Sequence, residues 1–376
     1  MNFEKITTYL DSLEARGIPS VDCMIYRDHE LLYRHMNGTT DEKKEKKMDG
    51  SEVYLMFSMT KVQTMTAVLQ LVEQGKLSLE DEVGKYLPAY QNLTVKKGDA
   101  AEPLTAPLKI KHLLSMQSGL DYDLGRPGIV RVLKEKGNAA NTQDIVNAFV
   151  ESPLLFVPGE HFNYSLSHDV VAAVIEVVSG MTFGEYLKKN VWEPLGFKNT
   201  SFAKPMNDDV KGLTKQFICN EKGEIVPMDQ SCCYQFTENY ESGGAGLISS
   251  TEDYAVFADA LACGGITKDG VRILKPETVE LMKTNLLGEA SREDIVKTMG
   301  RVGYGYGCGV QIVMEPEKMN STAPAGVFGW DGAAGSCITM DTKSKISLVY
   351  TQHVRNCGWA YGEIHPTLRD MVFGEE

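Results

Sequence analysis

Residues 57–88 read FSMTKVQTMTAVLQLVEQGKLSLEDEVGKYLP. Apolar side chains recur on a helical period at positions 62, 65, 68, 69 and 72, and the run stops at Gly75. Both features predict a helix that ends near this glycine. Ser58 and Lys61 lie at the start of this segment. Because residues at i and i+3 stack on one helical face, we expect the Lys61 amine to reach the Ser58 hydroxyl.

This serine and lysine form a candidate nucleophile pair. A serine hydroxyl becomes a useful nucleophile when a neighbouring base removes its proton, and a partly desolvated lysine is such a base. A serine at a helix N-terminus also lies in the positive end of the helix dipole, where its own N–H can stabilise an oxyanion. The alternative is an exposed first helical turn with an ordinary surface lysine.

The S-x-x-K pattern is weak by itself, because Ser201 and Lys204 match it too. Pro205 follows that second lysine, and no helical period surrounds it. We therefore expect the second copy to lie in a loop, where its serine and lysine need not face each other.

Strand patterns lie at both ends of the chain, with helical patterns between them. VDCMIYR and ELLYRHM flank Asp28-His29 near the N-terminus, which predicts a hairpin, and SCITMDT and KISLVYTQ flank Lys343-Ser344 near the C-terminus. The clearest helical pieces of the middle are KIKHLLSMQSGL, TQDIVNAFVES and HDVVAAVIEVVSG. GGAGLISS follows the middle, and Ser250 then predicts a helix cap with Asp253 three residues on.

This order predicts an α+β fold. The N-terminal hairpin would complete an antiparallel sheet of C-terminal strands, flanked by helices and carrying an inserted, mostly helical lobe. Residues 1–84 together with 245–376 would form the sheet domain, and residues 85–244 would form the lobe. A cleft between the two is the natural ligand site.

Composition narrows the range of partners and compartments. A net charge of −13 and a pI near 5.1 disfavour nucleic acid and anionic membrane surfaces as the main partner. No apolar run reaches the length of a membrane span, and the N-terminal MNFEKITTYLDSLEARG lacks an apolar signal-peptide core. The eight cysteines include no C-x-x-C pair. We expect a reduced, cytoplasmic protein that binds neither nucleic acid nor membrane.

Common cofactor motifs are missing from the sequence. There is no H-E-x-x-H, no G-x-x-x-x-G-K-[ST], no G-x-G-x-x-G and no G-x-S-x-G. We therefore expect neither a metal nor an organic cofactor.

A second candidate element is PGEHFNYSLSHDVV at residues 158–171. It places Tyr164 in a loop just before a helical run. A phenol near an ammonium loses its proton more readily, so Tyr164 beside Lys61 would transfer protons as base and acid. Simple packing is the alternative, and Tyr90 is a similar tyrosine in a stretch that reads as a loop.

Several segments in order resemble one superfamily. These are the opening segment, LKIKHLLSMQSGL, FVPGEHFNYSLSHDVVAAVIEVVSG and GGAGLISSTEDYAVFADALACGG. Over nearly its whole length the chain resembles the serine β-lactamase and penicillin-binding-protein superfamily, in the class C branch with its carboxylesterases, acyltransferases and D-aminopeptidases. The resemblance implies a β-lactamase/transpeptidase-like fold. It also implies Ser58 as the acylated nucleophile, Lys61 as its proton partner and Tyr164 as the general base and acid.

The sequence departs from that superfamily at Leu166. The family's Tyr-x-Asn motif reads Tyr164-Ser165-Leu166 here. An amide that helps β-lactam-active relatives to hold their substrate is therefore absent, and Leu166 would meet the substrate instead.

FGWDGAAGS at residues 328–336 matches the family's third landmark, a strand that usually carries Lys-Thr-Gly or His-x-Gly. Trp330-Asp331-Gly332 resembles the Trp-Gly-Gly of the esterase branch and would contact the substrate. In that alignment the Ala333 N–H joins the Ser58 N–H in the oxyanion hole, where losing one donor typically costs about 100-fold in rate.

These departures favour one activity within the superfamily. Trp330 replaces a cationic or polar anchor and Asp331 adds negative charge, so substrates recognised by a free carboxylate would be disfavoured. We predict a serine hydrolase that forms an acyl-enzyme on Ser58 and acts as a carboxylesterase on small neutral esters. The alternatives are a β-lactamase or D-amino-acid peptidase or amidase, an acyltransferase, and a non-catalytic binding protein of the same fold. The expected partner is a small-molecule ester, amide or lactam.

Overall fold

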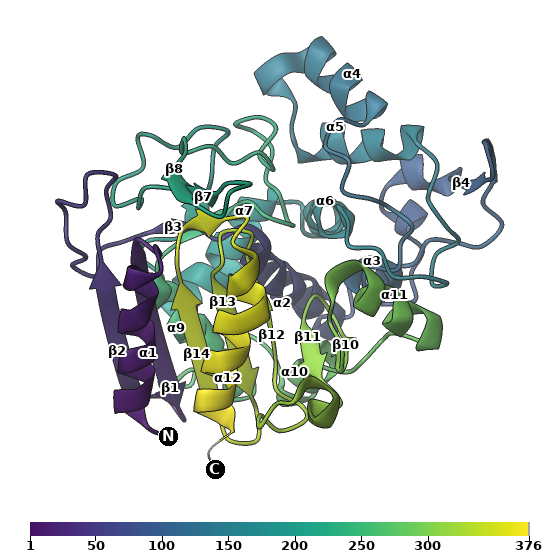
Figure 1. The fold of residues 1–376 in the computed structure, drawn as a ribbon. Helices are drawn as coiled ribbons and strands as arrows, with labels where there is room; N and C mark the ends of the chain where they lie inside the picture. The colour runs from purple at the N-terminus through teal and green to yellow at the C-terminus, as the bar shows by residue number, and fades with distance from the viewer. Residues whose placement is uncertain (375–376) are drawn as a thin grey trace.

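Strands from both ends of the chain form one seven-stranded sheet (Figure 1). The computed structural model describes residues 1–374. The strand order is β10-β11-β12-β13-β14-β1-β2, and every neighbouring pair is antiparallel. The strands are β1 (Ser20–Arg27), β2 (Glu30–Gly38), β10 (Tyr304–Tyr306), β11 (Gln311–Val313), β12 (Phe328–Asp331), β13 (Cys337–Asp341) and β14 (Ile346–Thr351). The predicted α+β class is confirmed, with the hairpin completing the sheet.

Helices cover both faces of this sheet. Helices α1 (Phe3–Ala15) and α12 (His365–Phe373) lie on one face, and α9 (Thr251–Ala262) lies on the other (Figure 1). Residues of β1 alternate accordingly, because Val21, Cys23 and Ile25 pack with α1 and α12 while Met24 packs into the opposite core. The Asp28-His29 turn between β1 and β2 has positive φ at both residues, 47° and 71°, as a tight two-residue hairpin requires.

The predicted helix after Ser58 is α2 (Thr60–Glu73), and Gly75 beyond its end has a φ of 67°. A single 3-10 turn, η1 (Phe57–Met59), precedes it. Residues 60–71 of α2 are buried all round, so its polar side chains need partners inside the protein. The Thr64 hydroxyl donates to the Gly243 carbonyl at 2.6 Å, and Gln63 accepts from the Trp192 indole at 2.7 Å. These bonds hold the start of α2 against the rest of the core.

The middle of the chain carries the predicted helices and several that the pattern did not indicate. The helices are α3 (Ile110–Leu114), α4 (Pro127–Lys136), α5 (Thr142–Asn147), α6 (Ser167–Ser179), α7 (Phe183–Leu187) and α8 (Glu193–Leu195), followed later by α10 (Pro276–Met282) and α11 (Glu289–Met299). A small hairpin, β4 (Thr94–Lys97) and β5 (Ala100–Pro103), lies beside them. Ser250 caps α9 by accepting from the Asp253 N–H, as expected.

Short strands connect the middle segment to its surroundings. Strand β9 (Leu247–Ser249) pairs with both β3 (Tyr54–Leu55) and β6 (Ser201–Phe202). Strand β7 (Phe217–Cys219) pairs with β8 (Ile225–Pro227) and with β15 (Val354–Arg355). One hydrophobic core also runs from α2 into α6. The division into residues 1–84 with 245–376 and residues 85–244 stays a prediction.

All eight cysteines are free thiols. Within residues 1–374, no single helix is long and apolar enough to cross a membrane. The helical segments Ser167–Ser179 and Phe183–Leu195 together have the length and apolar composition of a membrane span, but they are bent by 75° relative to each other.

Candidate active site

Ser58 lies in the η1 turn at the start of α2 and opens onto a cavity of about 1010 Å³. The residue before it, Phe57, has a φ of 44°, an uncommon conformation for a bulky residue. The Phe57 ring is completely buried and packs edge-on against Tyr234 at 5.9 Å. This packing holds the strained turn in place, and the turn leaves Ser58 partly exposed at the cavity wall.

The Lys61 side chain is fully buried, and its ammonium has three acceptors. Nζ donates to Ser58 Oγ at 3.1 Å, to the Tyr122 hydroxyl at 3.2 Å and to the Gly244 carbonyl at 2.6 Å. Burial lowers the pKa of Lys61 to about 7, and the carboxylates of Asp169 and Asp331 act against this shift. A substantial fraction of Lys61 is therefore a neutral amine near pH 7, within reach of the Ser58 proton.

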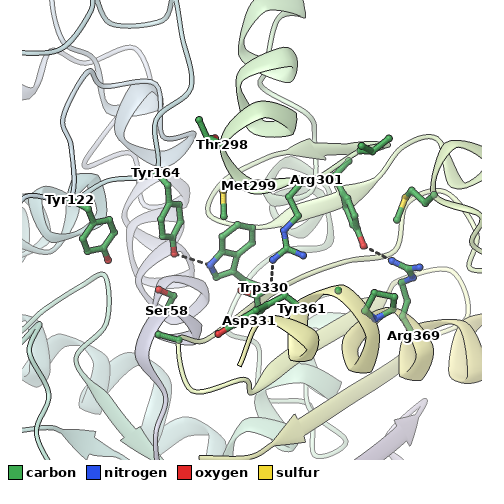
Figure 2. Close-up of a pocket in the computed structure, with 18 of the residues that line it drawn as sticks. Ser58, Tyr122, Tyr164, Thr298, Met299, Arg301, Trp330, Asp331, Tyr361 and Arg369 are labelled. Carbon is green, nitrogen blue, oxygen red and sulfur yellow. Dashed lines mark hydrogen bonds and ion pairs between the residues drawn. The ribbon is translucent and has the colours of Figure 1, made fainter. Parts of the chain in front are cut away.

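Two tyrosines lie beside this pair. The Tyr164 hydroxyl accepts a hydrogen bond from Trp330 Nε1 at 3.0 Å (Figure 2). Lys61 Nζ lies 4.7 Å from the centre of the Tyr164 ring. The Tyr122 ring stacks on Tyr164 with 5.5 Å between ring centres. Burial raises the pKa of both phenols, and hydrogen bonding with Ser58 acts against the rise. Both phenols are protonated at neutral pH.

The structure brings Ser58, Lys61 and Tyr164 together as the sequence analysis expected. The contact between Tyr122 and Lys61 was not expected. No sequence spacing could have indicated it, because Tyr122 lies 61 residues after Lys61.

Trp330 is almost completely buried and lies between two tyrosine rings. Its ring is tilted against the Tyr164 ring, with 5.6 Å between ring centres, and packs edge-on against the Tyr306 ring, with 5.1 Å between ring centres. Trp330 therefore positions the Tyr164 hydroxyl through the indole N–H, in addition to forming part of the apolar wall.

Asp331 forms an ion pair with Arg301, a residue that the sequence analysis missed (Figure 2). Both side chains are about one-tenth exposed, and the guanidinium carbon also lies 5.8 Å from the centre of the Trp330 ring. The expected free negative charge beside the site is therefore compensated. Asp331 therefore does not disfavour carboxylate substrates as expected, because a buried cation balances its charge.

Beyond Asp331 the chain turns tightly at Gly332, where it passes the segment before Ser58. A Cβ at position 332 would lie 2.3 Å from the Met56 carbonyl oxygen, so only glycine fits. Ala333 lines the cavity together with Ser58. Its N–H has no hydrogen-bond acceptor among residues 1–374. This is the arrangement that an oxyanion-hole donor needs.

Leu166 does not line the cavity, contrary to the expectation that it would meet the substrate. It is only 2% exposed and packs into the core at the residue preceding α6. The reason is that α6 starts immediately after the Tyr164 loop and turns this apolar side chain inward.

The other candidates from the sequence are accounted for by ordinary packing. Ser201 is exposed in β6, and Lys204 pairs with Asp209 at 3.3 Å, so the second S-x-x-K forms no serine–lysine contact. The buried Tyr90 donates to the Val146 carbonyl at 2.8 Å.

Asp169 is a second residue that the sequence analysis missed. It is buried in the first turn of α6, where it accepts from the Tyr240 hydroxyl at 2.7 Å and the Ser242 hydroxyl at 2.6 Å. Its Oδ2 has no partner within the described residues. A Cβ on Gly244 would lie 2.7 Å from this oxygen and 3.4 Å from Lys61 Nζ. The absence of a side chain at Gly244 thus brings a buried carboxylate close to the ammonium.

One family model and several known proteins match most of this chain. The sequence model of the Beta-lactamase family matches residues 6–356. Protein Rv1367c of Mycobacterium tuberculosis is 28% identical over 338 residues, covering 87% of this chain and 84% of the relative. Esterase EstB of Burkholderia gladioli is 26% identical over 390 residues, covering 96% of this chain and 92% of the esterase. The solved structure of EstCE1, described as a hydrolase with promiscuous acyltransferase activity, superposes with a TM-score of 0.81 at 25% identity, covering 99% and 98%.

Proposed function

Since this chain belongs to the Beta-lactamase family, we propose that it is a serine hydrolase that forms an acyl-enzyme on Ser58 and acts as a carboxylesterase on neutral esters. The observation that carries the proposal is the contact between Lys61 Nζ and Ser58 Oγ at 3.1 Å, in a setting where burial lowers the pKa of Lys61 to about 7. A surface lysine would be charged at neutral pH and would be unable to accept the serine proton.

In the proposed acylation step, neutral Lys61 accepts the Ser58 proton while Oγ attacks the ester carbonyl carbon. The carbonyl oxygen becomes an oxyanion, which the N–H groups of Ser58 and Ala333 stabilise. When the tetrahedral intermediate collapses, the bond to the alcohol breaks and the leaving alkoxide needs a proton. Water then repeats the sequence on the acyl-enzyme and regenerates the Ser58 hydroxyl.

Tyr164 suits the role of proton donor to the leaving group. Burial raises the pKa of this phenol, so the proton is present when the alkoxide forms. The hydrogen bond from Trp330 Nε1 stabilises the phenolate that remains, and the Lys61 ammonium, formed in the previous step, lies over the ring face. Returning the Lys61 proton to Tyr164 completes the cycle.

Two observations favour an ester over a β-lactam. The position of the family's cationic or polar anchor is held by Trp330, and Arg301, whose guanidinium carbon lies 5.8 Å from the centre of the Trp330 ring, is engaged by Asp331. EstB and EstCE1 carry esterase and hydrolase descriptions and match over almost the whole chain. Acyl transfer to an alcohol is the second candidate, because the cavity of about 1010 Å³ has room for an acceptor and EstCE1 is described as having such an activity.

The proposal is tested by labelling with a fluorophosphonate and by comparing p-nitrophenyl butyrate with nitrocefin, each with the Ser58→Ala variant as control. We expect an adduct on Ser58, and butyrate hydrolysis that the variant loses. Absence of any adduct in folded protein would favour a non-catalytic binding protein. Efficient nitrocefin turnover that depends on Ser58 would overturn the preference for esters.

A further inference from the structure

A second groove adjoins the Ser58 cavity. It has a volume of about 670 Å³ and shares Val302, Tyr304 and Lys318 with the main cavity. The ridge between the two is the short loop from Gly300 to Tyr304, in which Gly300 and Gly303 have φ of 67° and 77°. The two hollows therefore lie side by side, with Val302, Tyr304 and Lys318 as their common wall.

Apolar side chains lie open to solvent in this groove. Val296 on α11 is 39% exposed and Val302 on the ridge is 44% exposed, while Leu287 beneath them is buried at 5%. Exposed valines gathered at one concave place mark a binding surface more often than isolated ones do. Met299 and Met319 add apolar surface to the lining of the Ser58 cavity.

Charge around the groove is balanced. Its rim carries three acidic and three basic side chains, Glu289, Glu293, Glu315, Arg292, Lys297 and Lys318. Glu315 pairs with both Arg292 and Lys318, so these two cations are already engaged. The alkyl stems of such residues add apolar surface below their charged ends. A groove of this kind selects for an uncharged hydrocarbon and against an ionic ligand.

We propose that this groove, which we call the α11 groove, holds the far end of a long hydrocarbon chain of the ester, so that long-chain esters are better substrates than short ones. The inference rests on the proposed function and names the substrate class of the same site. The wall that the groove shares with the Ser58 cavity is the reason to assign an ester chain as the occupant, because a chain long enough to pass Val302 would enter the groove. The main cavity alone, at about 1010 Å³, already stands at the upper end of the range of about 300–1,000 Å³ for ligand pockets.

The expected size of the effect follows from burial of methylene groups. Each methylene group that moves from water to an apolar surface contributes enough binding free energy to raise kcat/KM about threefold to fourfold. Chains too short to reach the α11 groove would lack this gain, and longer chains would show a steep rise that levels off when the groove is full.

The test uses two series of substrates, because the chain can belong to either side of the ester bond. One series varies the acyl group of p-nitrophenyl esters from acetate to dodecanoate, and the other varies the alcohol of butyrate esters from ethanol to dodecanol. The substrates are kept below their micelle concentrations. We expect kcat/KM to rise with chain length in one series, and the series that rises assigns the groove to the acyl or the alcohol side.

The variant that tests the groove is Val296→Asn combined with Val302→Asn. We expect it to reduce the ratio of kcat/KM between the longest and shortest ester by tenfold or more. Val302→Trp, which would fill the junction between groove and cavity, should reduce the same ratio. The matched control is Val130→Asn, since Val130 is 53% exposed on α4, away from both hollows, and should leave the ratio unchanged.

A flat profile in both series would overturn the inference, as would a rise that neither groove variant alters. If the groove variant instead breaks an oligomer seen by light scattering and leaves the profile unchanged, the valines form an interface between copies and the inference is again wrong. Fluorophosphonate labelling separates these results from failure of the proposed function, because labelled Ser58 with a flat profile leaves the esterase intact.

Discussion

Replacing Asp169 with asparagine should move the acidic limb of the pH–rate profile. Lys61 must be neutral to accept the Ser58 proton, so kcat/KM should rise with pH through the Lys61 pKa of about 7. The Asp169 carboxylate stabilises the ammonium form and thereby raises this pKa against the larger effect of burial. Asp169→Asn keeps an oxygen that can accept from Tyr240 and Ser242 but removes the charge.

The sign and size of the shift follow from the geometry. A Cβ placed on Gly244 would lie 2.7 Å from Asp169 Oδ2 and 3.4 Å from Lys61 Nζ. The carboxylate oxygen and the ammonium nitrogen are therefore roughly 6 Å apart at most. An opposite charge at about 4–6 Å typically shifts a pKa by about one to three units, and removing a carboxylate shifts a lysine downwards. With a pKa of about 7, about one-tenth of Lys61 is neutral at pH 6; a fall of about two units makes that about nine-tenths.

The assay is the pH dependence of kcat/KM for p-nitrophenyl butyrate between pH 4.5 and 9, each profile scaled to its own plateau. The control is Asp99→Asn, because Asp99 is exposed in the β4–β5 turn and should leave the limb in place. A limb that stays where it was, or moves to higher pH, would refute the reasoning. The lysine would then not be the group whose deprotonation starts the reaction.

Three further outcomes are expected. Tyr164→Phe should lower kcat/KM for p-nitrophenyl butyrate about 100-fold or more, because it removes the proton donor. Tyr122→Phe removes one hydrogen-bond acceptor of Lys61 and should lower the same kcat/KM about tenfold or less. Arg301→Met should destabilise the protein by about 3–5 kcal/mol in urea unfolding, because it leaves Asp331 buried without its cation, and Asp331→Asn in the same chain should recover part of the loss. Gly332→Ala should slow fluorophosphonate labelling of Ser58 about 100-fold, since the new Cβ would collide with the Met56 carbonyl and displace the oxyanion-hole turn. The matched control is Gly288→Ala, because a Cβ at position 288 meets open space. Equal labelling rates for the two variants would contradict the assigned role of Gly332.

The parts of the fold that local patterns specify were predictable from the sequence. The period and the stop at Gly75 indicated α2, and the Asp28-His29 turn indicated the hairpin, because each depends on residues close together in the chain. Helix α4 was missed, since its ten residues from Pro127 to Lys136 are too few for a clear helical period, although Ile129 and Val132 are buried. Its position is decided by contacts with the neighbouring segment after Asn147, which no local pattern contains.

The candidate site divides in the same way. Ser58 and Lys61 are three residues apart, so helical geometry alone brought them together. The Arg301–Asp331 ion pair joins the loop before β10 to the end of β12, and only the order of strands in the sheet places these two segments together. Leu166 shows the opposite failure: a match to a motif suggested a substrate contact, but the start of α6 directs that side chain into the core.

The balance of charges around Lys61 explains why Asp331 needs a partner. Burial disfavours the ammonium, and two carboxylates, Asp169 and Asp331, favour it. If both acted at full strength, Lys61 would remain charged and could not accept the Ser58 proton at neutral pH. Because Arg301 engages Asp331, that carboxylate is partly neutralised and Asp169 becomes the main counter-charge. The ion pair therefore stabilises the turn at Trp330-Asp331-Gly332 and also keeps the pKa of Lys61 low enough for catalysis. Arg301→Met should accordingly move the acidic limb to higher pH, opposite to Asp169→Asn, and a shift in the same direction for both variants would contradict this account.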